Sequence, residues 1–454
     1  MSNTQPFSLL RPNFVTDAQT YATIVSMLLR IAVLVGGASD IEFLLRHGQA
    51  ASIDISLLDL ALQVNDIKKI EALLIYGDRF FNREIRQKAL MNTVDSDCEG
   101  IVKSLLEPSI GNVDPNFWTP SSTSKLYTPL HSAVLNQSFN IVCLLLRHGA
   151  NPNAQNSSGT SPLHLVGDSS PHIAQYLIKC GAFIDIQDND GHSPLHSISD
   201  LEIAKKFLGA DPNIADCKNG ATALHAMLDT GDMELVTWVC KEAGANPTPP
   251  CDVPPFEHAF RNGMYPTPLI ALGLDPWQRN KDGETIAHSS LTMSHSNEDD
   301  YFQSIFLAEL LDHDPSLIHA RDYSENTPLH IAAAKCSPSV ILSLVNKHCA
   351  DMTAVNRFGF SPLTQAVVFR RDATSIRCVL KLMKDRGLGV DSSTDNHGWT
   401  ALHHAAFHRN NTAVPILIKH GANCNAVNVL GRRPLHLCGY VFLPWSKLLL
   451  VRRP

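Results

Sequence analysis

The chain has 454 residues, of which 44% are hydrophobic and 18% charged, a composition that excludes an intrinsically disordered protein. Its net charge of −7 gives no electrostatic reason to expect a nucleic-acid partner. At roughly 150 residues per domain the length suggests about three domains, but a repeat array escapes this rule because it grows by stacking similar units.

The first element in chain order is an apolar stretch over residues 24–37. Arg30 interrupts it, and it is shorter than the roughly 20 apolar residues that a membrane-spanning helix needs. We therefore expect a buried helix here and no insertion into a membrane. We also expect no secretory leader, and the 11 cysteines are scattered singly without a Cys-x-x-Cys pair. These features predict reduced thiols in the cytoplasm or the nucleus.

A short motif of Ser or Thr, Pro or Ala, Leu and His recurs further along. It first occurs as Thr-Pro-Leu-His at residues 128–131 and returns 33 residues later at 161–164. Further copies or close variants begin at residues 193, 222, 327, 361, 400 and 433. Ser or Thr suits a helix N-cap, and Pro suits the first helical position because its missing N–H would be unpaired there. Each motif therefore predicts the start of a helix.

Two other elements accompany this motif. A leucine-rich run that ends in Gly, as at residues 144–149, predicts a second helix that ends in a left-handed residue. An Asp or Asn three residues before a Gly, as at 188–191, 356–359 and 395–398, predicts a turn that projects between units. Cys349 replaces the Gly of the second-helix element in one unit, at a cost of about 1 kcal/mol for a left-handed backbone.

The linked elements and their period resemble the ankyrin repeat, whose signature is Thr-Pro-Leu-His-x-Ala. The resemblance is strong from residue 128 to the C-terminus. It implies an all-α solenoid of helix-turn-helix units with projecting hairpin loops. It also implies that the histidine of the motif is structural and bonds to the backbone of a hairpin.

The copies divide the chain into blocks of different regularity. We expect an N-terminal tail at 1–20, degenerate ankyrin-like repeats at 21–120, ankyrin repeats at 121–247, degenerate repeats with an insertion near 294–300 at 248–326, and ankyrin repeats ending in an incomplete unit at 327–454. In the fourth block, residues 269–276 align with the second-helix element. The first helix of that unit is therefore expected at 255–260.

Nothing in the motifs indicates catalysis. Packed helices lie roughly 8–10 Å apart and zinc ligands about 2 Å from the metal, so equivalent histidines of successive units cannot share an ion. Asp-Asn-Asp-Gly at 188–191 resembles part of a calcium loop, but Ser197 stands where that loop needs Glu. No P-loop, His-Glu-x-x-His or Gly-x-Ser-x-Gly motif is present. We expect no enzyme activity, no cofactor and no metal.

Ankyrin repeats bind partners with hairpin tips and exposed residues of their first helices, which stack into a concave surface. At these positions three successive units carry aromatic side chains, the residue type most favoured as an interface anchor. The alternative is that these rings pack within the array. The candidate partner-binding residues are Tyr323, Phe358, Phe360, Trp399, Phe407, His397 and Arg357.

The sequence thus favours a monomeric, non-catalytic scaffold that binds protein partners. The alternative is a substrate-recruiting adaptor of a ubiquitin ligase, although neither residues 1–20 nor the C-terminal tail shows a convincing docking box. The partner itself is not indicated, because a fold does not fix a function.

Overall fold

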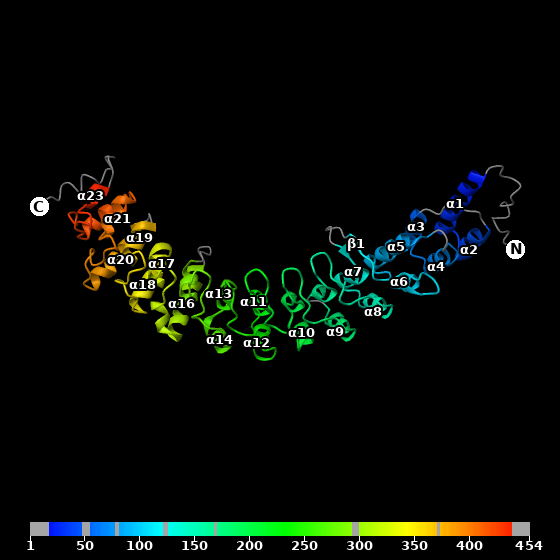
Figure 1. Ribbon diagram of the computed structural model, residues 1–454, viewed down its shortest axis with the longest axis horizontal. Coiled ribbons are helices and arrows are strands. Elements are labelled where there is room, and N and C mark those ends of the chain that lie inside the picture. The colour runs from blue at the N-terminus through cyan, green and yellow to red at the C-terminus, as the bar shows by residue number, and fades with distance from the viewer. Residues whose placement is uncertain are drawn as a thin grey trace. The chain divides into compact units, whose positions relative to one another are not determined.

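The computed structural model describes residues 18–47, 55–77, 81–120, 126–167, 170–292, 299–369 and 373–437. The chain forms two compact units, Met1–Ile214 and Ala215–Pro454. Each unit is a series of short helices joined by turns, as the all-α solenoid implied by the repeat motif requires (Figure 1).

The N-terminal unit consists of helix pairs stacked one after another. Its elements are α1 (Ala18–Leu34), α2 (Ala38–His47), α3 (Ile55–Val64), α4 (Ile67–Tyr76), α5 (Arg83–Asp95), α6 (Glu99–Leu106), β1 (Thr119–Pro120), β2 (Leu126–Tyr127), α7 (Pro129–Leu135), α8 (Phe139–Arg147), η3 (Pro162–Leu165), α9 (Pro171–Lys179), η5 (Pro194–Ser197), α10 (Leu201–Ala204) and η6 (Lys205–Phe207). The helices α1, α3, α5 and α7 pack successively in one layer, and α2, α4, α6 and α8 form the other. The strands β1 and β2 make a small antiparallel hairpin before α7.

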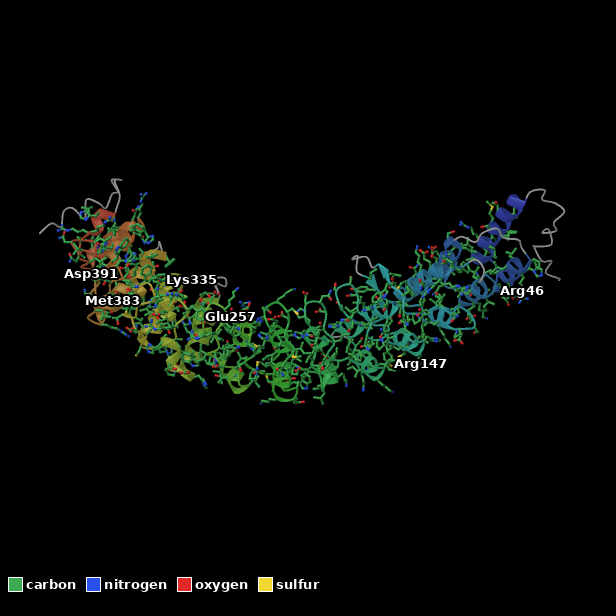
Figure 2. The ribbon with its side chains drawn as sticks, viewed as in Figure 1. Arg46, Arg147, Glu257, Lys335, Met383 and Asp391 are labelled. Atoms are coloured by element: carbon green, nitrogen blue, oxygen red, sulfur yellow. The ribbon has the colours of Figure 1, made fainter. Side chains whose placement is uncertain are left out.

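The core of this unit lies between the two layers. In α7 and α8 the side chains of Leu130, Val134, Ile141 and Leu145 are fully buried. Their spacing of four places each pair on one helix face, and each such side chain contributes about 1.5–3 kcal/mol by leaving water. Charged side chains such as Arg147, at the end of α8, remain outside (Figure 2).

The C-terminal unit has the same two-layer plan. Its elements are α11 (Ala223–Asp229), α12 (Met233–Lys241), α13 (Pro255–Arg261), α14 (Pro266–Ala271), α15 (Ile286–Thr292), α16 (Asp299–His313), η7 (Pro315–His319), α17 (Pro328–Lys335), α18 (Pro338–Asn346), α19 (Pro362–Phe369), α20 (Ala373–Asp385), α21 (Ala401–Phe407), α22 (Ala413–Lys419) and α23 (Pro434–Leu437). The first helices pack in the order α11, α13, α15, α17, α19, α21 and α23, and α14, α16, α18, α20 and α22 pack as the second layer.

The degenerate repeats of this unit are held by phenylalanine. The rings of Phe260 in α13 and Phe306 in α16 lie 4.6 Å apart. Phe256, which is also in α13, packs on the same Phe306 ring. All three side chains are buried. The insertion expected near 294–300 lies largely outside the described residues, and the block boundaries expected from the sequence stay predictions.

The motif histidine, where present, can tie its first helix to the following hairpin. The Thr128 N–H donates to Nδ1 of His131 at 3.2 Å, and Nε2 of the same ring lies 3.1 Å from the Thr160 carbonyl. Since Nδ1 accepts and Nε2 donates, the ring is neutral, and burial lowers the pKa of His131 to about 4. The structural role implied by the repeat motif is confirmed here and at five further histidines. These are His164, His225, His288, His330 and His403.

The sequence prediction was wrong about the length of two first helices and right about the backbone at Cys349. The motifs at Ser161 and Ser193 lead to the short 3₁₀ turns η3 and η5, where the sequence predicts full first helices. For η5 the reason is space, because the second helix begins at Leu201, too close to Ser193 for two α-helical turns to precede it. The left-handed conformation expected at Cys349 is confirmed by its φ of 54°.

Candidate protein-binding surface

The turn at residues 356–359 fixes two phenylalanines in different positions. The Asn356 side-chain oxygen accepts from the backbone N–H groups of Phe358 at 2.9 Å and Phe360 at 3.0 Å. The backbone closes the same turn, because Asn356 N–H donates to the Phe360 carbonyl at 3.0 Å. Phe358 therefore projects at the tip and is 58% exposed, whereas Phe360 lies at the base and is half-buried.

The next hairpin repeats this arrangement with other side chains. The Asp395 carboxylate accepts from the N–H groups of His397 at 2.8 Å and Trp399 at 2.7 Å. His397 is exposed at the tip, and Trp399 is half-buried at the base. The sequence pattern of Asn or Asp before Gly thus produces the predicted projecting turn, with one side chain outside and one inside.

Hydrogen bonds join these tips to their neighbours. Arg357 N–H donates to the Ser324 carbonyl at 2.9 Å, and the Asn396 side chain donates to the Arg357 carbonyl at 3.1 Å. Gly359 has a φ of 79°, and a Cβ there would stand 2.6 Å from backbone atoms of Asp395 and Asn396. Only glycine allows this approach, so the tips hold their side chains in fixed positions.

The structure gathers four of the candidate aromatic residues into one cluster. Trp399 lies 5.2 Å from Phe407 of α21, ring centre to ring centre, and Phe358 lies 5.9 Å from Phe360. The two pairs meet through the ring of His404, which is 4.7 Å from Phe360 and 5.0 Å from Trp399. We call Phe358, Phe360, Trp399 and Phe407 the aromatic surface. Phe407 is 53% exposed, so the cluster is open to solvent on the α21 side as well as at the tip.

Tyr323 is placed differently from the other candidates. It is 65% exposed, but its ring lies over the preceding hairpin, directly against the position that a Cβ on Gly283 would take. It therefore covers a glycine on one side and presents its other side to solvent. Arg357 and His397, the two remaining candidates, are exposed at the tips beside the aromatic surface.

His404 is the residue of this region that the sequence did not single out. Its Nε2 donates to the Asp395 carboxylate at 3.0 Å. Both side chains are buried, with 6% of His404 and 5% of Asp395 exposed. Burial lowers the pKa of His404 to about 4 although Asp395 opposes that shift. The buried Nδ1 has no hydrogen-bond partner. A histidine directly after the motif, where other repeats have Ile331 or Ser132, was the available signal.

Three basic side chains and a further histidine ring are exposed on this unit. Arg357, Arg409 and Lys335 are exposed on the same unit, and the exposed ring of His408 stacks on His404 at 6.2 Å. Aromatic rings that are open to solvent at fixed positions offer an apolar area that a partner could cover. Within the described ranges, no group of three His, Cys, Asp or Glu side chains is placed to hold a metal ion. No helix in the described part of the chain is long and apolar enough to cross a membrane.

Comparison with known proteins agrees with the repeat geometry. A family model described as ankyrin repeats (3 copies) matches residues 29–156, 130–201 and 373–440, and a single ankyrin-repeat model matches residues 324–357. Together these matches reach into both compact units and include part of the region where the sequence motifs are degenerate.

A plant protein kinase and the inversins of several mammals match part of this chain. The serine/threonine-protein kinase VIK of Arabidopsis thaliana is 30% identical over 111 residues, which is 24% of this chain and 23% of the kinase. Inversin of Homo sapiens is 30% identical over 119 residues, 26% of this chain and 11% of inversin, and the Mus musculus protein is 29% identical over the same length. The matched stretch thus spans less than a quarter of each relative. With the family models covering more than half of its length, the chain belongs to the ankyrin-repeat family.

Proposed function

We propose that this chain is a non-catalytic scaffold that binds a protein partner through the aromatic surface of its C-terminal unit, with Tyr323, Arg357 and His397 at the border. Ankyrin repeats are protein-interaction modules, and that much follows from the family. The observation that supports the particular surface is that Phe358 and Phe407 are 58% and 53% exposed while hydrogen-bonded turns fix their neighbours.

Exposed aromatic rings at fixed positions favour binding for two physical reasons. A phenylalanine or tryptophan ring removes a large apolar area from water when a partner covers it, and such residues dominate many interfaces. The turns at Asn356 and Asp395 are already closed by backbone and side-chain hydrogen bonds. Little conformational entropy is then lost when the partner binds, which raises affinity.

Affinity purification with quantitative mass spectrometry tests this proposal. The parent chain is compared with Phe358→Ala/Phe407→Ala, which removes exposed rings and leaves the half-buried Phe360 and Trp399 in place. The matched control is Phe183→Ala, since Phe183 is 64% exposed but belongs to the N-terminal unit. We expect a set of direct partners to be lost with the double variant and kept with the control. Identical partners with all three proteins would contradict the proposal.

The same experiment addresses the adaptor alternative, which no observation favours. Ubiquitin-ligase subunits among the partners that depend on neither ring would revive it. We further propose a monomer in the cytoplasm or nucleus, where a chain with singly scattered cysteines and no Cys-x-x-Cys pair is expected to keep reduced thiols. Light scattering of the purified chain and imaging of a tagged form test these two points.

A further inference from the structure

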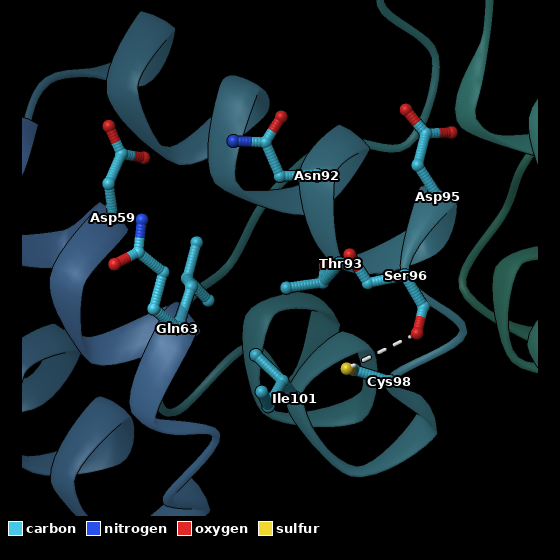
Figure 3. Close-up of a pocket in the computed structure, with 9 residues that line it drawn as sticks. Asp59, Gln63, Asn92, Thr93, Asp95, Ser96, Cys98 and Ile101 are labelled. Carbon is cyan, nitrogen blue, oxygen red and sulfur yellow. Dashed lines mark hydrogen bonds between the residues drawn. The ribbon is translucent and has the colours of Figure 1, made fainter.

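Two neighbouring cavities open on the N-terminal unit, at a distance along the sequence from the aromatic surface. The first, of about 420 Å³, lies between α3 and α5 above the start of α6. Figure 3 shows Asp59 and Gln63 of α3 on one side of it and Asn92 and Asp95 of α5 on the other, with the polar ends of Asp59, Asn92 and Asp95 directed the same way.

The second cavity, of about 680 Å³, lies on the other side of α5. It is lined by α5, by α7 and by the β1–β2 hairpin, through Glu84, Lys88, Trp118, Tyr127 and Asn136 among others. Asn92 and Asp95 line both cavities. One extended ligand that crosses α5 at these two residues would therefore occupy both.

The lining of the two cavities is negatively charged. Asp59, Glu84 and Asp95 contribute three carboxylates, against the single cation Lys88. Burial raises the pKa of Asp95, although its hydrogen bond with Ser132 acts in the opposite direction. A carboxylate that is partly removed from water gains from a cationic ligand, and a lining of this sign repels the phosphates of nucleic acids.

Two aromatic rings stand beside these carboxylates. Trp118 is 43% exposed, and Tyr127 stacks on the ring of His131 at 5.6 Å with an angle of 13° between the planes. The His131 stack and the short β hairpin hold the Tyr127 ring in place. Aromatic faces within reach of carboxylates attract the guanidinium of arginine or the ammonium of lysine.

The repeat spacing sets the separation between the cationic side chains that such a ligand needs. Packed helices lie about 8–10 Å apart, and a polyproline II segment, which has three residues per turn, advances about 3.1 Å per residue and so brings every third side chain to the same face. Two cations that enter the cavities on either side of α5 would thus stand about three residues apart. The amides of Gln63, Asn92 and Asn136 remain to bond the backbone of the ligand.

We propose that the two cavities around α5 form a binding site for a basic segment of a protein in the extended polyproline II conformation, with Arg or Lys at every third position. The carboxylates of Asp59, Glu84 and Asp95 pair with the basic side chains. The rings of Trp118 and Tyr127 stack on the guanidinium or ammonium groups. The site uses residues of the N-terminal unit only, so it stands or falls independently of the aromatic surface.

Fluorescence anisotropy with the full chain tests the site. The probe is a labelled Gly/Ser peptide with Arg at every third position. Two further peptides carry the same number of Arg residues in one contiguous run, or Glu in place of Arg. The variant Glu84→Gln/Asp95→Asn removes two lining charges with almost no change in shape. Its control, Glu202→Gln/Glu242→Gln, removes the same charge at two exposed positions outside the cavities.

We expect the spaced Arg peptide to bind the parent and the control alike, and the Glu84→Gln/Asp95→Asn variant at least about tenfold more weakly. Trp118→Leu should also weaken binding, with an unchanged circular dichroism spectrum. The acidic peptide should not bind. Equal weakening in both charge variants would mean attraction to the net charge of the chain alone and would overturn the proposal. So would equal affinity for the spaced and contiguous peptides, or no binding by the parent.

Discussion

The two units of this chain present opposite surfaces on the same kind of repeat. In the N-terminal unit, first helices line two open cavities, one of them with a hairpin, and Asp59, Glu84 and Asp95 are among the lining residues. In the C-terminal unit, the equivalent elements expose the rings of Phe358 and Phe407, and the exposed Arg357 and Arg409 lie one and two residues away in the sequence. The backbone that supports both is the same, because capped first helices and Asx-closed turns recur in each unit.

This difference shows how a repeat separates stability from recognition. The motif histidine, the turn glycine and the buried leucines occupy fixed positions and build the frame. The side chains at the tip and on the outer face of the first helix are free to change sign or polarity. If that separation is correct, damage to the frame should affect the two units equally, whereas damage to the surface should not.

Acidification should give the largest effect and should act on both units. The folded pKa values of His131, His225 and His330 are about 4, below the ordinary 6.5, so the unfolded chain binds more protons between these values. Stability is therefore fully present above pH 6.5 and is lost as the pH falls toward 4, by on the order of 3 kcal/mol per histidine. Hydrogen exchange with mass spectrometry against pH should show loss of protection in both units. Protection that stays constant in one unit down to pH 4 would contradict the claim that the same histidine contacts stabilise both units.

Glycines at the turns should give the next largest effect. A Cβ on Gly159 in the N-terminal unit, or on Gly359 in the C-terminal unit, would stand 2.6 Å from the backbone of the following hairpin. With positive φ at both, Gly159→Ala and Gly359→Ala should each cost about 3 kcal/mol in urea unfolding. Gly149→Ala and Gly421→Ala are the controls, since both have positive φ but nothing within 4 Å, and should cost about 1 kcal/mol. A large difference between Gly159 and Gly359 would argue against a common frame.

The buried pair of Asp395 and His404 lies in the C-terminal unit and sharpens the contrast. His404→Leu leaves the Asp395 carboxylate buried without its 3.0 Å partner and should cost about 2–3 kcal/mol. In Asp395→Asn/His404→Leu the amide oxygen can still close the turn, so this double variant should be at least as stable as the parent. Thermal unfolding of the three proteins decides the point. Equal losses for the single and double variants would mean that the packing of the His404 ring, not its hydrogen bond to Asp395, matters.

The smallest expected effect concerns Cys349. Its φ of 54° is the strained counterpart of Gly149, which has a φ of 85° in the N-terminal unit. Cys349→Gly should stabilise the C-terminal unit by about 1 kcal/mol, because relief of left-handed strain exceeds the entropy cost of glycine. Cys180→Gly is the control. Cys180 caps α9 with a negative φ of −88°, so this change should destabilise.

The sequence predicts the frame well because each frame residue acts locally. Thr128 and His131 are three residues apart, and their capping interaction needs nothing beyond the motif. The shortened turn η5 was missed because its length depends on where the next helix starts. A motif shows where an element begins, but the space left to it is set by its neighbours.

The surfaces are less predictable for a related reason. The sequence identified Phe360 and Trp399 as binding candidates, but their half-burial depends on His404, which reaches Asp395 across the hairpin. The cavities around α5 were not foreseen, because Asp59, Asp95 and Trp118 come from two helices and a hairpin. Contacts between elements that no local pattern specifies have to be read from the fold.

The hydrogen bonds from motif histidines to the following hairpins also bear on the order in which the repeats unfold. His330 bonds to the Phe360 carbonyl and His403 to the Arg432 carbonyl, so each of these two repeats is tied to its successor. At Ser361 the motif ends in Thr364, whose hydroxyl lies 3.2 Å from that of Ser361 and is too short to reach the next turn. This junction therefore lacks the histidine bond and relies on others, such as the one from Asn396 to the Arg357 carbonyl. Under load or heat, we expect residues 400–437 to unfold as one cooperative segment before the repeats on their N-terminal side unfold.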